Sequence, residues 1–335
     1  MKQKVVKAFS LTDLLKVKNW KAYIVWKWDE MVLLELNLPD WSYWRILKEV
    51  LSYVEDDAKF LDEGGYLVIK QLNDEFRIKK WVVNSIFEVN DELVKYFDVD
   101  LSLIYDDINR LCNVADENWI NLVFTWIYFQ EVNWKLRLVA TDWFLLMYKD
   151  YDLNWKWNYI LGIRWLKQLM RIFDKTEKVW VKDDKFYVKN WWDIFVWFIN
   201  EAIFPEYENF FNNEIKWEYR IEAKDLLKVR NFIKKIVKVA LPIFVIKEEN
   251  GNILIEPEKT IEMWTKKKAL NFKKVIKWEV NCNKPVYIGW EVLSKILNFL
   301  DKDSELVLKV WDGICYVEVW WFKWVFKIQE VEDKK

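Results

Sequence analysis

The sequence predicts an α+β protein of three similar domains, each with helices on one face of an antiparallel sheet. One order of elements recurs three times along the 335 residues: an amphipathic helix, an acidic loop and a strand hairpin. The repeat spacing, roughly 110 to 130 residues, is too long for a solenoid and indicates separate domains. Further strands are expected where β-branched and aromatic residues concentrate, at residues 123–132, 136–140 and 194–199.

The repeated elements can be placed copy by copy. The expected helix and two hairpin strands lie at residues 43–54, 66–70 and 75–79 in the first copy. They lie at 163–173, 179–181 and 186–189 in the second copy, and at 291–300, 306–310 and 315–319 in the third. The last two copies agree closely, since Trp191-Trp192 and Trp320-Trp321 follow the second strand in both. We expect domains at 1–99, 100–213 and 214–335, the first one shortened at its N-terminus.

The net charge and the cysteine content limit the possible functions of the protein. The chain has 53 acidic and 52 basic residues, so any attraction to nucleic acid must come from a local surface. Three separated cysteines (Cys112, Cys282 and Cys315) form neither a metal-ligand pair nor a disulfide framework, which is typical of the reducing cytoplasm. No export signal or membrane-spanning apolar stretch is recognisable. The sequence therefore predicts a cytoplasmic protein that does not insert into a membrane.

Residues for catalysis are scarce. Histidine is absent, which removes the usual proton-transfer group near neutral pH and the most common metal ligand. Carboxylate pairs occur at Asp56-Asp57, Asp106-Asp107 and Asp183-Asp184, but in loops or at helix starts, where acids are solvated or cap the helix. No phosphate-binding loop, nucleophile elbow or metal cluster is present. We therefore expect no catalytic residues, no metal and no cofactor.

Tryptophan and glycine occur in abnormal numbers. The chain has 25 tryptophans and six glycines, which together would make an ordinary glycine content of about 9%. Several tryptophans follow Asn or Asp, as in Asn133-Trp134 and Asn154-Trp155, where turns favour glycine. We hypothesise that many or all of them are glycines in the organism, encoded by UGA codons that it reads as glycine. On this view Trp134, Trp143, Trp155 and Trp191 should lie at turns and be poorly buried.

Basic side chains gather on one face of several expected helices. In helices over residues 221–240 and 163–175, lysines and arginines fall opposite the apolar residues. One such face would be an ordinary solvated surface, but its recurrence in three domains favours a surface that meets phosphates. The residues assigned to it are Arg45, Lys48, Arg164, Lys167, Arg171, Lys175, Lys224, Lys228, Lys235, Lys238 and Lys295.

Two motifs point to a known family. Residues 133–143 include Leu-Arg-Leu-Val-Ala-Thr-Asp, which resembles a second-domain signature of the bacterial DNA polymerase III beta subunit, the sliding clamp. In that family a glycine follows the motif, and Trp143 stands in its place here. Phe204-Pro205-Glu206-Tyr207 is similar to the Phe-Pro-Asp-Tyr that ends the same domain, and Leu169-Met170-Arg171 is similar to its helix. The resemblance is strong over 100–213, moderate over 214–335 and weak before residue 100.

The resemblance implies a processivity factor for DNA polymerase. Two three-domain subunits would form a head-to-tail ring around double-stranded DNA, with helices lining the hole and sheets forming the outer wall. The basic helix faces would then meet the phosphates without reading the sequence. Such a ring holds the polymerase by topology and neither makes nor breaks a bond. Its partners would be DNA, a second copy of the chain, the polymerase and the clamp-loader subunits.

The family also has a hydrophobic cleft that binds short linear peptides of the polymerase and clamp loader. The resemblance places the cleft here at Thr141, Trp143, Phe144, Leu146, Pro205, Phe210, Val325, Phe326 and Ile328. Leu145 and Asn209 stand where the family often has arginine, and Lys327-Ile328-Gln329 replaces a Met-Pro-containing ending. Ordinary core packing is the alternative interpretation of Leu146, Pro205 and Phe210.

A binding protein with true tryptophans is the alternative function. Exposed indole rings would stack on the bases of single-stranded nucleic acid or on sugars. Such a protein would bind linear single strands directly, whereas a clamp would need its loader.

Overall fold

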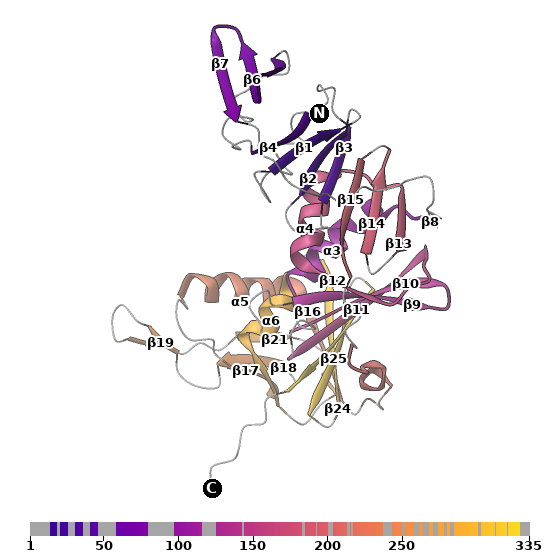
Figure 1. Ribbon diagram of the computed structural model, residues 1–335. Coiled ribbons are helices and arrows are strands. Elements are labelled where there is room, and N and C mark those ends of the chain that lie inside the picture. Colours follow the sequence, from indigo (N-terminus) through magenta and orange to yellow (C-terminus); the bar gives the residue numbers. More distant parts are fainter. Residues whose placement is uncertain are drawn as a thin grey trace. The chain divides into compact units, whose positions relative to one another are not determined.

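A computed structural model describes most of the chain (Figure 1). The described residues are 14–18, 21–25, 31–35, 41–45, 58–79, 97–115, 125–142, 144–182, 185–191, 193–199, 204–212, 215, 217–236, 243–249, 252–257, 261–263, 268–270, 274–277, 280–281, 285–300, 303–311, 313–319 and 321–328. They form two compact units. One comprises Met1–Asn109 with Leu161–Glu201, and the other Arg110–Ile160 with Ala202–Lys335.

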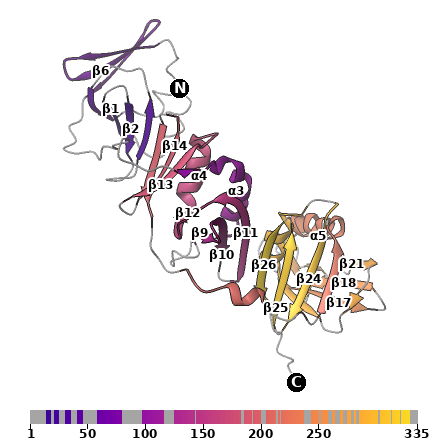
Figure 2. The same cartoon turned by 90° about the vertical axis from the view of Figure 1, so that its right-hand side faces the viewer.

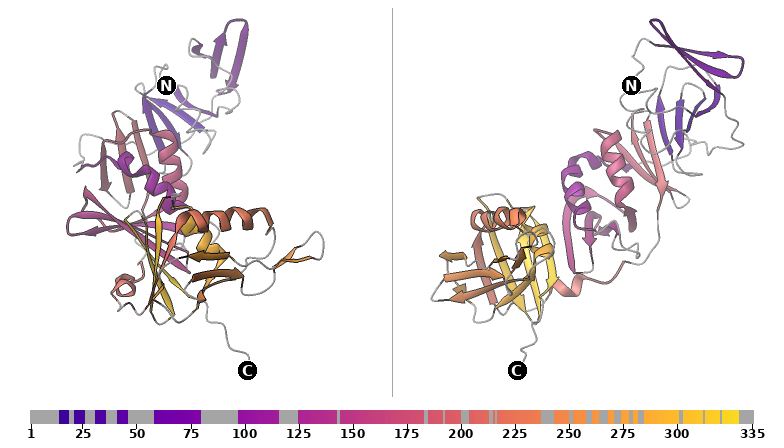
Figure 3. Two further views of the ribbon diagram at one scale, coloured as in Figure 1. Left: turned by 180° about the vertical axis from the view of Figure 1, so that it is seen from behind. Right: turned by 90° about the vertical axis from the view of Figure 1, so that its left-hand side faces the viewer.

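The first unit contains an antiparallel eight-stranded sheet. Its strands, in spatial order, are β4 (Trp41–Arg45), β1 (Leu14–Lys18), β2 (Lys21–Val25), β3 (Met31–Glu35), β15 (Asp193–Phe198), β14 (Lys185–Asn190), β13 (Lys178–Lys182) and β8 (Phe97–Asp98). Helix α4 (Ile163–Ile172) lies against this sheet (Figure 3). The Phe173 ring, just after the helix, contacts Phe195 on β15. Because β3 pairs with β15, the sheet joins strands from the first and second expected domains.

The second unit contains a nine-stranded antiparallel sheet. Its spatial order is β12 (Tyr159–Gly162), β9 (Trp126–Val132), β10 (Lys135–Thr141), β11 (Leu145–Asn154), β26 (Phe322–Lys327), β25 (Ile314–Val319), β24 (Glu305–Trp311), β16 (Trp217–Glu222) and β22 (Val280–Asn281). Pairing of β11 with β26 joins strands of the second and third expected domains. Since both large sheets continue across the expected domain boundaries, those boundaries stay a prediction.

Smaller elements complete the second unit. A four-stranded sheet has the order β21 (Lys274–Lys277), β18 (Asn252–Pro257), β17 (Ile243–Glu249) and β23 (Val286–Gly289), and β19 (Ile261–Met263) pairs with β20 (Lys268–Leu270). Helices α5 (Ala223–Ile236) and α6 (Trp290–Leu297) pack against each other, and Figure 2 shows α5 next to strands β24 to β26. In the second unit, η4 (Glu208–Phe211) precedes β16. The 3-10 helix η2 (Leu101–Ile104) belongs to the first unit, and the helix that follows it, α3 (Tyr105–Cys112), spans the boundary between the units at Asn109 and Arg110.

The repeated order of elements is confirmed for the second and third copies. Helix α4 is followed by the antiparallel strands β13, β14 and β15, and α6 by β24, β25 and β26. The hairpin of the first copy is also present as β6 (Tyr66–Gln71) and β7 (Asp74–Lys79), beside β5 (Lys59–Glu63). Helix α4 turns Ile163, Leu166, Leu169 and Ile172 into the core, as its apolar spacing predicts.

Two helix predictions were wrong at their starts. Tyr43 to Arg45, expected in the first helix, lie in β4, where Trp44 pairs with Leu15 on β1. The aromatic residues of this stretch have high strand propensity, and the neighbouring edge of β1 supplies the backbone partners. Helix α5 begins at Ala223 and not at Ile221, because Ile221 pairs with Leu306 on β24.

Three tryptophans occupy positions that favour glycine. Asn133 and Trp134 form the two-residue turn between β9 and β10 with φ of 53° and 63°, the backbone of an Asn-Gly turn. Trp191 (φ 54°) and Trp321 (φ 69°) lie in the equivalent turns after β14 and β25. The three residues are 71%, 71% and 78% exposed. Positive φ is rare for bulky residues, so this geometry supports the glycine hypothesis at these three sites. Leu72 (φ 50°) also adopts this backbone.

Other tryptophans are buried. Trp155, expected to be exposed at a turn, is instead fully buried, and its indole N–H donates to the Trp157 carbonyl at 2.6 Å. That expectation was wrong because Trp155 follows the long strand β11, from which its side chain turns inward onto Phe129. Trp143 lies outside the described residues. In contrast to Trp155, the buried indole nitrogens of Trp197, Trp311 and Trp324 have no hydrogen-bond partner among the described residues, an unusual state for buried tryptophan.

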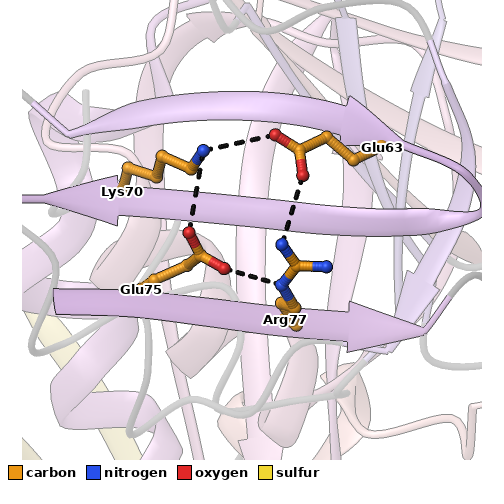
Figure 4. Close-up of polar contacts among 4 residues, drawn as sticks. All are labelled: Glu63, Lys70, Glu75 and Arg77. Atoms are coloured by element: carbon orange, nitrogen blue, oxygen red, sulfur yellow. Dashed lines mark hydrogen bonds and ion pairs between the residues drawn. The ribbon is translucent and has the colours of Figure 1, made fainter.

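A closed ring of charges crosses the sheet β5–β7 (Figure 4). Lys70 Nζ lies 3.3 Å from Glu63 and 3.6 Å from Glu75, and Arg77 bridges the same two carboxylates at 3.4 and 2.6 Å. Arg77 sits directly opposite the buried Val68, so the ring covers an apolar position. All four side chains are partly exposed, which keeps their contribution to stability small.

Candidate peptide-binding cleft and basic helix faces

An apolar cavity of about 470 Å³ opens on the nine-stranded sheet, where β11 meets β26. This volume lies within the range of about 300–1,000 Å³ that is usual for ligand pockets. It is lined by Thr141, Phe144, Leu145, Leu146, Phe204, Pro205, Glu206, Tyr207, Phe210, Gly313, Ile314, Val325, Phe326 and Lys327. Phe144 and Phe210 are 54% and 44% exposed, although both are large apolar residues. Exposed apolar residues around a concave surface are typical of a binding site.

The floor of the cavity is formed by two adjacent strands. Leu146 on β11 pairs with Val325 on β26, so their side chains lie next to each other on one sheet face. Thr141 pairs with Leu146 and extends the same face, while Ile314 and Lys327 pair at the far side. The floor therefore combines residues more than 170 positions apart in sequence.

One wall is the segment before and within η4. An aromatic layer fixes it to the sheet: Phe204 stacks on Tyr128 at 4.9 Å, and Phe211 meets the Tyr148 ring edge-on at 4.7 Å. Tyr207 is buried between them, and its hydroxyl donates to Gln130. Burial raises the pKa of the Tyr207 phenol, which keeps the hydroxyl protonated as a donor.

Arg137 ties this wall to the sheet by charge. Its guanidinium donates to both oxygens of Asp150 at 2.5 and 3.1 Å, a bidentate pair, and to Glu208 in η4 at 3.0 Å. It also stacks over the Tyr148 ring at 4.3 Å. Only 12% of the side chain is exposed, so these contacts are better shielded from water than a surface ion pair.

The opposite wall is the turn between β10 and β11. Asp142 is buried, and one of its carboxylate oxygens accepts the backbone N–H groups of Phe144 and Leu145 at 3.0 and 2.8 Å. The Thr141 hydroxyl donates to the Leu145 carbonyl at 2.9 Å. These bonds present the Phe144 side chain at the cavity rim. The Asp142 carboxylate thus accepts hydrogen bonds from backbone N–H groups of this turn, as backbone carbonyls do for the N–H groups of a strand.

The structure brings most of the predicted cleft residues together. Seven of them line the cavity: Thr141, Phe144, Leu146, Pro205, Phe210, Val325 and Phe326. Ile328 is buried outside the lining, where its N–H donates to the Gly313 carbonyl at 2.8 Å. Sequence reasoning missed Phe204, Tyr207 and Ile314 as lining residues, although Phe204 and Tyr207 belong to the motif that it had singled out.

The predicted basic face is present on α4. Arg164, Arg171 and, after the helix, Lys175 are exposed, and Lys167 is partly exposed, opposite the buried Leu166 and Leu169. The spacing of three and four residues places Arg164, Lys167 and Arg171 on one helix face. Arg164 also lies over the ring of its neighbour Trp165 at 5.3 Å.

The other predicted phosphate contacts vary. Lys224 and Lys228 are exposed on α5, where they pair with Glu222 and with Asp225 (3.1 Å). Arg45 lies on strand β4, not on a helix, and Lys235 on α5, but nothing is described of either side chain. Lys48 and Lys238 fall outside the described residues.

Lys295 is a correction to the predicted basic faces. Its ammonium lies 2.5 Å from the Asp142 carboxylate, with 16% of the lysine side chain and 4% of the aspartate side chain exposed. A lysine buried against a carboxylate is not available to phosphates, so we remove it from that set.

The described residues hold no group of three or more His, Cys, Asp or Glu side chains suited to bind a metal ion. Within the same ranges, no helix has the length and apolar character needed to cross a membrane.

Comparison by sequence finds no matching protein family and no matching curated protein. Comparison by structure finds bacterial beta clamps over nearly the whole chain. The DNA polymerase III beta subunit from Thermotoga maritima matches with a TM-score of 0.79 at 16% identity, covering 98% of this chain and 97% of that one. A putative beta subunit from Eubacterium rectale matches with 0.79 at 12% identity, covering 98% of both chains.

The Helicobacter pylori beta clamp, solved bound to a DNA ligase peptide, is also similar. It matches with a TM-score of 0.76 at 13% identity, covering 95% of this chain and 91% of that one. These matches show that the chain has the beta-clamp fold, and the fold resemblance predicted from the motifs is confirmed.

Proposed function

We propose that this beta-clamp fold serves as a DNA polymerase processivity factor, a ring that encircles duplex DNA and carries a peptide-binding cleft. The observation that carries the proposal is the cavity at the β11–β26 junction, where seven residues predicted from the sequence converge on a protein whose whole fold matches the clamps. The Helicobacter pylori clamp, bound to a DNA ligase peptide, is one example of that fold in complex with a peptide.

The basic helix faces support the DNA-binding part of the proposal. Arg164, Lys167 and Arg171 on α4 present positive charge along one helix face, and Lys224 and Lys228 add charge on α5. Flexible lysine and arginine side chains attract phosphates without reading bases, so a protein held this way can slide along DNA. The assembly we propose is a head-to-tail homodimer of three-domain subunits with domains 1–99, 100–213 and 214–335.

The cleft supports the partner-binding part. Its floor is apolar and its rim carries half-exposed phenylalanines, which suits two adjacent large apolar side chains of a short peptide. Glu206 and Lys327 are the charged residues of the lining, and they would meet the polar flanks of such a peptide. The partners we propose are the polymerase and the clamp-loader subunits of the same cell.

The proposed ring can be tested by its retention on circular DNA, from which a closed ring cannot slide off. The chain should be loaded onto nicked circular plasmid only with its clamp loader and ATP, and should be lost when the plasmid is cut once. Sedimentation should give a dimer at micromolar concentration. Retention on cut linear plasmid, or a monomer that loads nothing, would contradict the proposal.

The same purified protein can also be used to distinguish the alternative function, single-strand binding by stacked tryptophans, from a clamp. A tryptophan-stacking protein would bind a labelled single-stranded oligonucleotide directly, with no loader and no circular template. The exposure of Trp134, Trp191 and Trp321 is the observation in favour of that function. Their positive φ values argue against it, because these positions favour glycine.

A further inference from the structure

The side chain of Lys295 connects helix α6 to a wall of the cavity. The ammonium group contacts the Asp142 carboxylate at 2.5 Å and donates to the Val114 carbonyl, just beyond α3, at 2.9 Å. Val114 and Asp142 are both buried, and the lysine itself is mostly covered. A charge in such a place is stable only with fixed partners, so its geometry is well defined.

The Asp142 carboxylate passes this constraint on to the cavity rim. While one oxygen binds Lys295, the other accepts the N–H groups of Phe144 and Leu145, both cavity residues. The Asp142 N–H closes the turn on the Leu145 carbonyl at 3.1 Å, and the Phe144 carbonyl accepts from Lys327 on β26 at 3.4 Å. One carboxylate therefore orients the turn that holds the exposed Phe144 ring.

We infer that Lys295 is a positioning residue for peptide binding: through Asp142 it holds the 141–145 turn in the conformation that forms the cavity wall. This inference rests on the proposed function of the cleft. Among the described residues, Lys295 contacts Val114 and Asp142, which do not line the cavity, so its effect on a peptide would pass through the Asp142 carboxylate.

The test compares Lys295→Met with Lys295→Arg and Asp142→Asn. The first removes the ammonium and keeps the aliphatic stem, the second keeps the charge, and the third removes the charge of the partner. Lys135→Met on β10 is the matched control, because Lys135 also pairs with an aspartate, Asp152 at 3.0 Å, but is exposed and lines no part of the cavity. Two quantities are measured: amide hydrogen exchange of residues 144–148, and the Kd of a fluorescein-labelled peptide with adjacent Leu and Phe.

Lys295→Met should raise the exchange rate of the Phe144 and Leu145 amides at least tenfold and leave β24 unchanged. Lys295→Met should also raise the Kd of the labelled peptide about tenfold, whereas Lys295→Arg should keep much of the wild-type affinity. Adding Asp142→Asn to Lys295→Met should cause little further loss of affinity. Lys135→Met should change neither quantity. Wild-type exchange and affinity in Lys295→Met would overturn the inference.

The two proposals can fail separately. If the wild-type chain does not bind the labelled peptide, the proposed cleft is wrong, and the exchange rates alone then decide whether Lys295 holds the turn. If Lys295→Met does not fold, the same measurements on Lys295→Arg and Asp142→Asn decide the question. Unchanged exchange in Asp142→Asn would overturn the inference.

Discussion

Asn133 and Trp134 together turn the chain between β9 and β10 with both backbones in the left-handed region, at φ of 53° and 63°. The Trp134 N–H donates to the Glu131 carboxylate at 2.5 Å while its large ring is mostly exposed to solvent. The backbone of this residue is therefore fixed, whereas its side chain contributes little packing.

Replacing Trp134 by glycine should stabilise the fold. A left-handed backbone costs an L-residue about 1–2 kcal/mol that glycine does not incur, so Trp134→Gly should raise the free energy of unfolding by about 1 kcal/mol. Urea denaturation measures the change, and Trp191→Gly and Trp321→Gly should behave alike. Trp155→Gly is the contrasting control, with an expected loss of about 3–5 kcal/mol because that ring is buried. The gene should carry UGA at positions 134, 191 and 321, and UGG there would contradict the glycine hypothesis.

Truncating the cavity rim should weaken peptide binding and spare stability. Phe144→Ala and Phe210→Ala each remove a half-exposed ring, and each should raise the Kd of the Leu-Phe peptide about 5- to 30-fold, in line with about 1–2 kcal/mol per buried aromatic anchor. Fluorescence anisotropy gives the Kd. Leu103→Ala is the matched control, because Leu103 is 73% exposed and lines no part of the cavity. Equal affinities for all three variants would place the peptide elsewhere.

Charge reversal on α4 should change the salt dependence of DNA retention. If Arg164 and Arg171 each contact a phosphate, Arg164→Glu and Arg171→Glu should each reduce the slope of log K against log salt by about 1. The half-life of the loaded ring on nicked circles, measured across salt concentrations, reports this slope. Lys309→Glu is the control, because Lys309 lies on strand β24, where it pairs with Tyr316 on β25, and not on the α4 face. An equal effect of Lys309→Glu would show that net charge, and not the α4 face, is responsible.

The buried thiol of Cys315 should make the fold less stable at alkaline pH. Burial raises the pKa of Cys315 well above its usual value, so the unfolded chain loses that proton first as pH rises. The stabilisation is therefore complete below about pH 8.5, the ordinary thiol pKa, and falls above it. In a Cys282→Ser background, Cys315→Ala should flatten the decline in unfolding free energy between pH 8.5 and 10. Equal slopes with and without Cys315 would show that other groups cause the decline.

Much of the fold and part of the site could be predicted from the sequence. Helix α4 and the hairpins β13–β14 and β24–β25 follow from local periodicity, because their apolar faces are built from neighbours in the chain. The cavity residues near Thr141 and Pro205 could be found because short motifs carry them. In contrast, β4 was mistaken for a helix, since its strand conformation depends on pairing with β1.

The rest depends on contacts distant in sequence. Lys295 belongs to a helix face that looks solvated when only its neighbours are counted, and the carboxylate that binds it is 153 positions away. No local sequence pattern predicts such a pair. The same is true of Arg137, whose partner Glu208 lies 71 positions further along the chain.

The pairing of β11 with β26 makes residues 325–327 part of the cavity lining. A truncation that stopped before Phe322 would delete Val325 and Phe326 from the cavity and would also leave β11 with an unpaired edge, since β26 is its neighbour on that side. Nascent chains would therefore lack a complete cavity until β26 had emerged and paired with β11.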